Sequence, residues 1–100
     1  MVTLEPVQVG DHTLVAVEVK LPKTTLITVS TSKGYIMCGA LDVGLLNERL
    51  AARSIIAARA VGVKTIAELL AAPMESVTIE AERLGIVPGM SGVEALQRML

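Results

Sequence analysis

The sequence predicts an α+β domain: an N-terminal antiparallel sheet, then a strand–helix–strand crossover, then helices. Two observations carry this prediction. Apolar residues recur with a period of two over much of residues 1–38, which is typical of strands. From residue 39 they recur at helical spacing, and glycine, proline and capping residues separate the segments. We therefore expect a single domain over residues 1–100, with a β-rich region at 1–38 and a mixed, mainly helical region at 39–100.

Four strands are expected in the β-rich region, at residues 2–9, 13–21, 25–31 and 35–38. Residues 10–12 suit a hairpin turn between the first two strands, and residues 32–34 form a turn into the fourth. The third strand is rich in β-branched residues. The simplest arrangement of these strands is an antiparallel meander.

Both faces of the expected sheet carry apolar residues, which predicts a partner. The second strand places Thr13, Val15, Val17, Val19 and Leu21 on one face and Leu14, Ala16, Glu18 and Lys20 on the other. One layer of helices covers only one face, so association would have to cover the other. Replacing Val17 or Ile27 by a charged residue should then break the oligomer if that side chain faces the partner.

A helix of about residues 42–52 should follow, with Asp42 as its N-cap. The run at 54–61 could continue that helix. Its β-branched Ile55 and Ile56, and Gly62 soon after, favour a fifth strand, which would pair with the fourth through a crossover.

The last third of the chain predicts three helices. Thr65 and Glu68 have the spacing of a capping box, and Pro73 closes the helix that they open. A second helix is expected over residues 75–84, ended by Gly85 in a left-handed conformation. The spacing of Ser91 and Glu94 predicts another capping box and a final helix that includes Leu96 and Met99.

Composition argues for apolar surface buried against other copies or another partner, and against several kinds of partner. Hydrophobic residues make up 52% of the chain before its eight glycines are counted, against ~45–50% with glycine in an average domain. The net charge of −1 provides no field that would attract nucleic acid or an anionic membrane. Residues 60–70 resemble part of a helix-hairpin-helix DNA-binding module, but they lack its usual glycine and proline and a basic face. We therefore expect neither nucleic acid nor membrane as a partner.

A cytoplasmic location is expected. Glu5, Pro6 and Asp11 interrupt the N-terminus before an apolar signal region could form. No window approaches the ~20 apolar residues of a membrane-spanning helix. One cysteine cannot form an internal disulfide, which fits a reducing compartment.

Two interpretations of Cys38 stay open. The thiol would lie at the end of a strand, just before a helix N-terminus that favours a thiolate, where α/β sheets often place ligands. A cysteine nucleophile needs a base, and the only histidine is His12, while the charge of Asp42 opposes thiolate formation. The structural interpretation is favoured, because unpaired cysteines are among the most buried residue types.

Arginines offer a second set of candidate site residues. Arg49, Arg53 and Arg59 form a modest cationic group, and guanidinium groups can bind a carboxylate or phosphate. Ordinary surface pairs with Glu48 and other acids are the preferred alternative. Arg59 interrupts an apolar run, so it would need a partner if buried.

No metal or cofactor is expected. The single cysteine, the single histidine and the scattered carboxylates lack the paired spacing of a zinc site. The glycines match neither a dinucleotide-binding loop nor a phosphate-binding loop. Nothing identifies a small-molecule ligand.

Two segments, GYIMCGALD at residues 34–42 and RAVGV at 59–63, resemble the YunC-like proteins of bacteria and archaea, a family described as domain of unknown function 1805. The similarity covers nearly the whole chain. The N-terminal β-sheet region of that family mediates tetramerisation, so the resemblance implies a homo-oligomer, with a tetramer as its form. It carries no assigned activity, and no catalytic residue follows from it.

Two hypotheses of function result. The first is an uncharacterised small cytoplasmic protein that forms a homo-oligomer through its N-terminal β-region and acts as a structural or binding module. The second is a small thiol-dependent enzyme or sensor, with Cys38 as the reactive group, Asp42 and His12 as its partners and Arg59 as an anion contact. They differ in the reactivity that the folded protein should give to Cys38.

Overall fold

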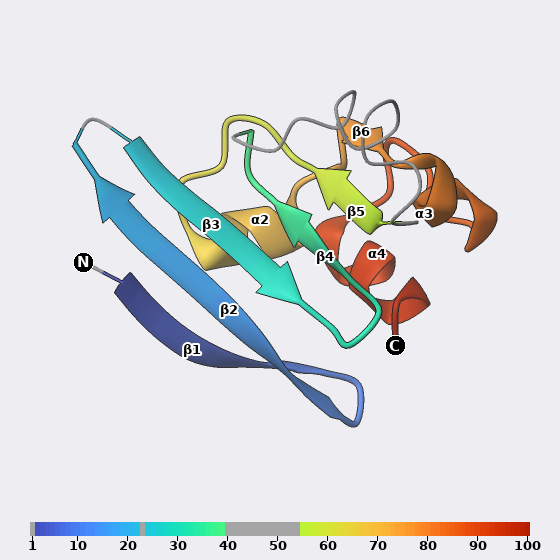
Figure 1. Ribbon diagram of the computed structural model, residues 1–100, viewed down its shortest axis with the longest axis horizontal. Coiled ribbons are helices and arrows are strands. Elements are labelled where there is room, and N and C mark those ends of the chain that lie inside the picture. The colour runs from blue at the N-terminus through green and yellow to red at the C-terminus, as the bar shows by residue number, and fades with distance from the viewer. Residues whose placement is uncertain (1, 23, 40–54) are drawn as a thin grey trace.

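The computed structural model describes residues 2–22, 24–39 and 55–100 (Figure 1). Within these residues one sheet has six strands, in the order of the chain. The strands are β1 Val2–Val9, β2 His12–Leu21, β3 Thr24–Ser30, β4 Gly34–Met37, β5 Ile56–Arg59 and β6 Ser76–Val77. The helices are α2 Ile66–Ala71, α3 Ile79–Arg83 and α4 Gly92–Arg98. The α+β class is therefore confirmed.

Strand pairing follows the prediction for β1 to β5 and extends beyond it. Neighbours from β1 to β4 pair antiparallel, and β5 pairs parallel with β4. The parallel pair confirms the crossover, although the expected helix at 42–52 lies outside the described residues. The predicted N-terminal sheet of about four strands is too small, because β5 and β6 belong to the same sheet.

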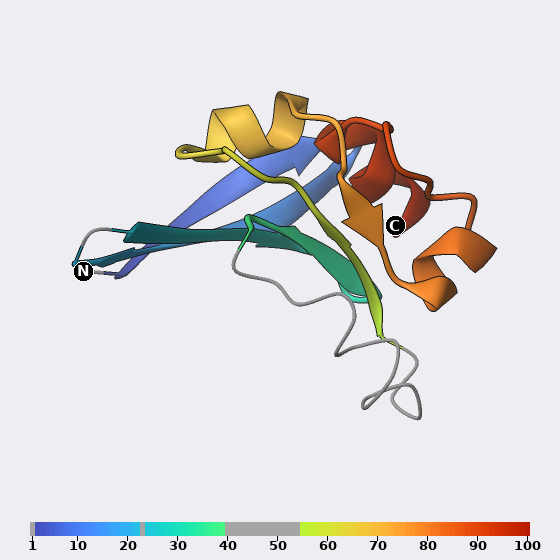
Figure 2. The ribbon, with the colours of Figure 1, turned by 90° about the horizontal axis from the view of Figure 1, so that it is seen from above.

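One side of the sheet holds the core and is called the inner face. The register places Ala16, Val29, Ile36 and Ala58 in one row across β2 to β5, and all four are fully buried. In Figure 2, α2 (yellow) and α4 (red) lie over this side of the sheet. Buried residues from the helices and their flanks complete the core: Leu69, Met74, Ala81, Ile86, Ala95, Leu96 and Met99.

The opposite side of β1, β2 and β3 is called the outer face, and among the described residues no helix covers it (Figure 2). Val17 lies on the outer face, as a contact with a partner requires. Ile27 lies on the inner face and is fully buried. Alternation along the strands gives the outer-face residues as Val2, Leu4, Pro6, Gln8, Thr13, Val15, Val17, Val19, Leu21, Thr24, Leu26, Thr28 and Ser30.

The capping box of α2 is confirmed. The Thr65 side chain accepts a hydrogen bond from the Glu68 N–H at 3.0 Å, and the Glu68 carboxylate accepts one from the Thr65 N–H at 3.1 Å. Two backbone donors that the helix itself leaves unpaired are thereby satisfied.

Helix α3 begins later than the helix predicted over residues 75–84. Ser76 and Val77 form β6, which pairs antiparallel with β5. Thr78 is extended, with φ −74° and ψ 162°, and its side chain caps α3 by accepting from the Ala81 N–H. The predicted end is confirmed, because Gly85 has a φ of +86°.

The final helix begins at the predicted place and packs closely on α2. The Ser91 hydroxyl caps α4 by accepting from the Glu94 N–H at 3.3 Å. Gly92 comes next, and a Cβ at this position would overlap the carbonyl oxygen of Leu69. Glycine therefore permits the backbones of α2 and α4 to approach each other.

Candidate functional site

Cys38 is 5% exposed and is held by the backbone of β3. Its sulfur accepts a hydrogen bond from the Ile27 N–H at 3.4 Å and lies 3.8 Å from the carbonyl oxygen of Thr25, to which the thiol donates. A buried sulfur held by two backbone contacts suits a structural cysteine more than an exposed, reactive one.

His12 lies far from Cys38. The backbone of Cys38 bonds to Ile27, and Ile27 is opposite Glu18 on β2. His12 is the first residue of β2, so the two side chains are separated by about 20 Å along the strand direction, at ~3.3 Å per residue. Proton transfer between them would need contact within hydrogen-bond reach, which this register prevents.

Arg59 points to the opposite side of the sheet from Cys38. It is the register partner of Met37, the residue before Cys38, and side chains alternate between faces along β4. Its side chain is 30% exposed, and its Nε lies 3.9 Å from a carboxylate oxygen of Glu75. An acidic neighbour thus accompanies this half-buried guanidinium, in line with the expectation of an ordinary ion pair.

The other candidates cannot be placed in this arrangement. Asp42, Arg49 and Arg53 lie outside the described residues. Among those described, the structure does not bring Cys38, His12 and Arg59 together. No group of acidic, histidine and cysteine side chains suited to a metal ion occurs in the described part of the chain.

A hollow of about 480 Å³ is lined by Thr25, a neighbour of Cys38, although Cys38 itself does not line it. Thr25 connects the two, because it lines the hollow and its carbonyl oxygen accepts from Cys38. The hollow is lined by Lys20, Leu21, Thr24, Thr25, Gly62, Val63 and Lys64. Gly62 to Lys64 follow β5, so the hollow opens at the carboxyl end of the parallel pair β4–β5, where open sheets commonly bind ligands. Its two ammonium groups could contact a small anion, although Lys20 also lies 3.9 Å from Glu18.

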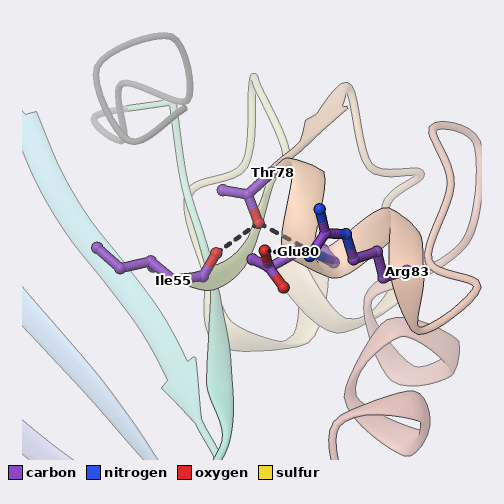
Figure 3. Close-up of polar contacts among 5 residues, drawn as sticks. Ile55, Thr78, Glu80 and Arg83 are labelled. Carbon is purple, nitrogen blue, oxygen red and sulfur yellow. Dashed lines mark hydrogen bonds and ion pairs between the residues drawn. The ribbon is translucent and has the colours of Figure 1, made fainter. Parts of the chain in front are cut away.

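Thr78 is a buried polar residue that the sequence did not single out, and its hydroxyl joins β5 to α3 (Figure 3). It donates to the Ile55 carbonyl at 2.7 Å and accepts from the Ala57 N–H at 3.1 Å, in addition to capping α3. Nearby, the Arg83 guanidinium donates to Glu80 at 2.9 Å across one turn of α3. The Thr78 contacts are all to backbone, which indicates a structural role.

Exposed apolar side chains gather on the outer face. Four of its residues, Val2, Leu4, Val15 and Leu21, are 45–69% exposed. They make up half of the large hydrophobic residues that are exposed in the described part of the chain. Contiguous apolar surface of this kind usually marks an interaction site.

Comparison with known proteins gives consistent results. The model of the family described as Domain of unknown function (DUF1805) matches residues 37–99. An uncharacterised protein from Bacillus subtilis, YunC, is 59% identical over 100 residues, which is 100% of this chain and 99% of that protein. The chain belongs to the YunC-like DUF1805 family.

The DUF1805 fold is also shared with a solved relative. The crystal structure of a protein of unknown function, TA1206 from Thermoplasma acidophilum, is 28% identical and has a TM-score of 0.89. The similarity covers 100% of this chain and 94% of that one. The family match begins at Met37, but both relatives extend over the N-terminal strands, so the β-rich region belongs to the shared fold.

Membership of the DUF1805 family confirms the resemblance drawn from residues 34–42 and 59–63. The names of both relatives leave their function open. No helix in the described part of this DUF1805 protein has the length and apolar character needed to cross a membrane.

Proposed function

We propose that this DUF1805 protein is a structural or binding module that assembles into a homo-oligomer through its N-terminal β-region. The observation that carries the proposal is the exposure of Val2, Leu4, Val15 and Leu21 on two neighbouring strands. Apolar surface removed from water contributes about 25 cal/mol per Å², so covering this region with another copy would be favourable.

The distribution of the core supports this proposal. Leu14 and Ala16 are buried on the inner face of β2, whereas Val15 between them is 50% exposed. The strand therefore has an apolar residue on each face and a helical cover on one. The high hydrophobic content and the tetramer implied by the family resemblance agree with a homo-oligomer.

The proposal places the protein in the cytoplasm. Cys38 is the only cysteine in the chain and is a free thiol, a pattern suited to a reducing compartment.

The test is the mass of the full-length chain in solution, measured by light scattering behind size-exclusion chromatography at micromolar concentrations. The expected mass is a multiple of the 10.5 kDa chain mass, with four copies as the form implied by the family. A single species of 10.5 kDa throughout this range would refute assembly.

A thiol-dependent enzyme or sensor is the second candidate. The observation in its favour is the lysine-lined hollow, which shares Thr25 with Cys38. The burial of Cys38 and its two backbone contacts support the structural role instead. Native-state reactivity of the thiol distinguishes the two.

A further inference from the structure

We infer that copies of this chain associate by packing the outer faces of β1, β2 and β3 against each other, and not by pairing their β1 edges. This inference rests on the homo-oligomer proposed above and names its contact surface. Two independent features of the N-terminal strands carry it: the chemistry of the outer face and the position of Pro6.

Charge is distributed unusually between the two sides of these strands. None of the outer-face residues of β1, β2 and β3 is charged. The charged residues of the same strands, Glu5, Glu18 and Lys20, lie on the inner face, on the same side as the helices. A strand face that remained in water would ordinarily be the polar one. The outer face therefore has the composition of a buried surface.

The missing charge also indicates the kind of partner. A two-fold contact brings the same patch of both copies together, so the patch must complement itself. A neutral, mostly apolar face satisfies this condition, because no like charges meet across the two-fold axis. A partner that binds through charged groups would find no opposite charges here.

The β1 edge is poorly suited to pairing with another strand. Residues of an antiparallel pair alternate between those whose backbone groups bond to the neighbouring strand and those whose groups point away. Val9 and His12 close the two-residue turn as a bonded pair, so Pro6, three residues earlier, directs its backbone to the free edge. Proline has no N–H to donate, and its ring obstructs an added strand.

Pro6 therefore interrupts the edge at the middle of β1 without weakening the contact with β2. Residues Leu4 and Gln8 keep outward N–H groups on either side of that gap. The same proline lines a hollow of about 240 Å³ together with the outer-face residues Leu4, Thr13 and Val15 and with Glu5 and Leu14, which alternate with them along the strands. One residue thus closes the edge and shapes the face.

The test compares the masses of five full-length variants with the wild type by sedimentation. Leu4→Lys and Val15→Lys each put a charge on the outer face at positions 69% and 50% exposed, so either can be made without opening the core. Gln8→Pro removes an edge N–H, and Gln8→Ala controls for the loss of its side-chain contacts to Gly10 and Thr13. Val87→Lys, at a valine 49% exposed in the segment between α3 and α4, is the matched control for Val15→Lys.

We expect Leu4→Lys and Val15→Lys each to weaken association at least about a hundredfold, because every contact would bury unpaired like charges. Val87→Lys, Gln8→Ala and Gln8→Pro should keep the wild-type mass. Circular dichroism confirms that each variant is folded, and the two lysine variants test the face independently.

Two results would overturn the face-to-face contact. One is a wild-type mass for both Leu4→Lys and Val15→Lys. The other is dissociation of Gln8→Pro with Gln8→Ala intact, which would assign the contact to the edge and leave the proposed β-mediated oligomer standing. A wild-type protein that is monomeric would instead remove the proposed oligomer itself.

Discussion

The Ile27 N–H donates a hydrogen bond to the sulfur of Cys38, with 3.4 Å between nitrogen and sulfur. In return, the Cys38 N–H donates to the Ile27 carbonyl at 3.0 Å. The only cysteine of the chain thus continues the pairing between β3 and β4. Because a buried thiol is shielded from reagents, these contacts predict that Cys38 reacts slowly in the folded protein.

Cys38 should react slowly with a thiol reagent in the native protein. Its side chain is buried and its proton is donated to Thr25, so labelling should require local or global opening. The measurement is the labelling rate at pH 6 with and without denaturant, with at least a tenfold slower native rate expected. A native rate above that of the unfolded chain would support the thiol-dependent enzyme or sensor.

Thr78→Val should lower the free energy of unfolding by about 2–4 kcal/mol, because it removes a helix cap and leaves buried backbone groups of Ile55 and Ala57 without their partner. Thr78→Ser keeps the hydroxyl and is the matched control, with a smaller loss expected. Chemical denaturation measures both. A loss for Thr78→Val no larger than the loss for Thr78→Ser would show that the hydrogen bonds of the hydroxyl stabilise the fold less than the packing of the methyl group does.

Gly92→Ala should lower the free energy of unfolding by about 1–3 kcal/mol. The added Cβ would overlap the Leu69 carbonyl and lie 3.0 Å from Ile36 Cδ1. Gly39→Ala is the control, because the nearest atom to its Cβ position is 3.6 Å away, on Val61. That variant should stay within about 0.5 kcal/mol of the wild type. A neutral Gly92→Ala would mean that α2 and α4 are not packed as closely as described.

Ile27→Lys and Val17→Lys should behave differently although the two residues lie on adjacent strands. Ile27 is fully buried on the inner face, so a lysine there should abolish the cooperative unfolding transition. Val17 lies on the outer face, so its lysine variant should remain folded and lose assembly. Thermal unfolding followed by circular dichroism distinguishes them. A folded Ile27→Lys variant would contradict the assignment of the inner face.

Local sequence patterns predicted much of this fold because their causes are local. Alternation identified β1 to β4, and the reciprocal contacts of Thr65 and Glu68 follow directly from their spacing. The parallel pairing of β5 with β4 followed from the β-branched run before Gly62.

What the sequence did not reveal depends on contacts between distant residues. Strand β6 has only two residues, too few to show a period, and it exists because β5 provides a partner. The neighbours of Cys38, Thr25 and Ile27, are 13 and 11 residues away and are set by strand register. Alternation along the sequence puts Val17 and Leu14 on opposite faces of β2. Which of the two faces the helices depends on contacts between distant residues, so the pattern alone does not decide it.

The most direct measurement of the central claim is hydroxyl-radical footprinting of the assembled wild-type protein, comparing Leu4 with Leu84. In a single chain Leu4 is 69% exposed and Leu84 is 37% exposed, so an isolated chain should oxidise roughly twice as fast at Leu4. Association through the outer face predicts the opposite order, with Leu4 protected below Leu84 and the protection lost in Val15→Lys. Faster oxidation of Leu4 than of Leu84 in the assembled protein would contradict the account.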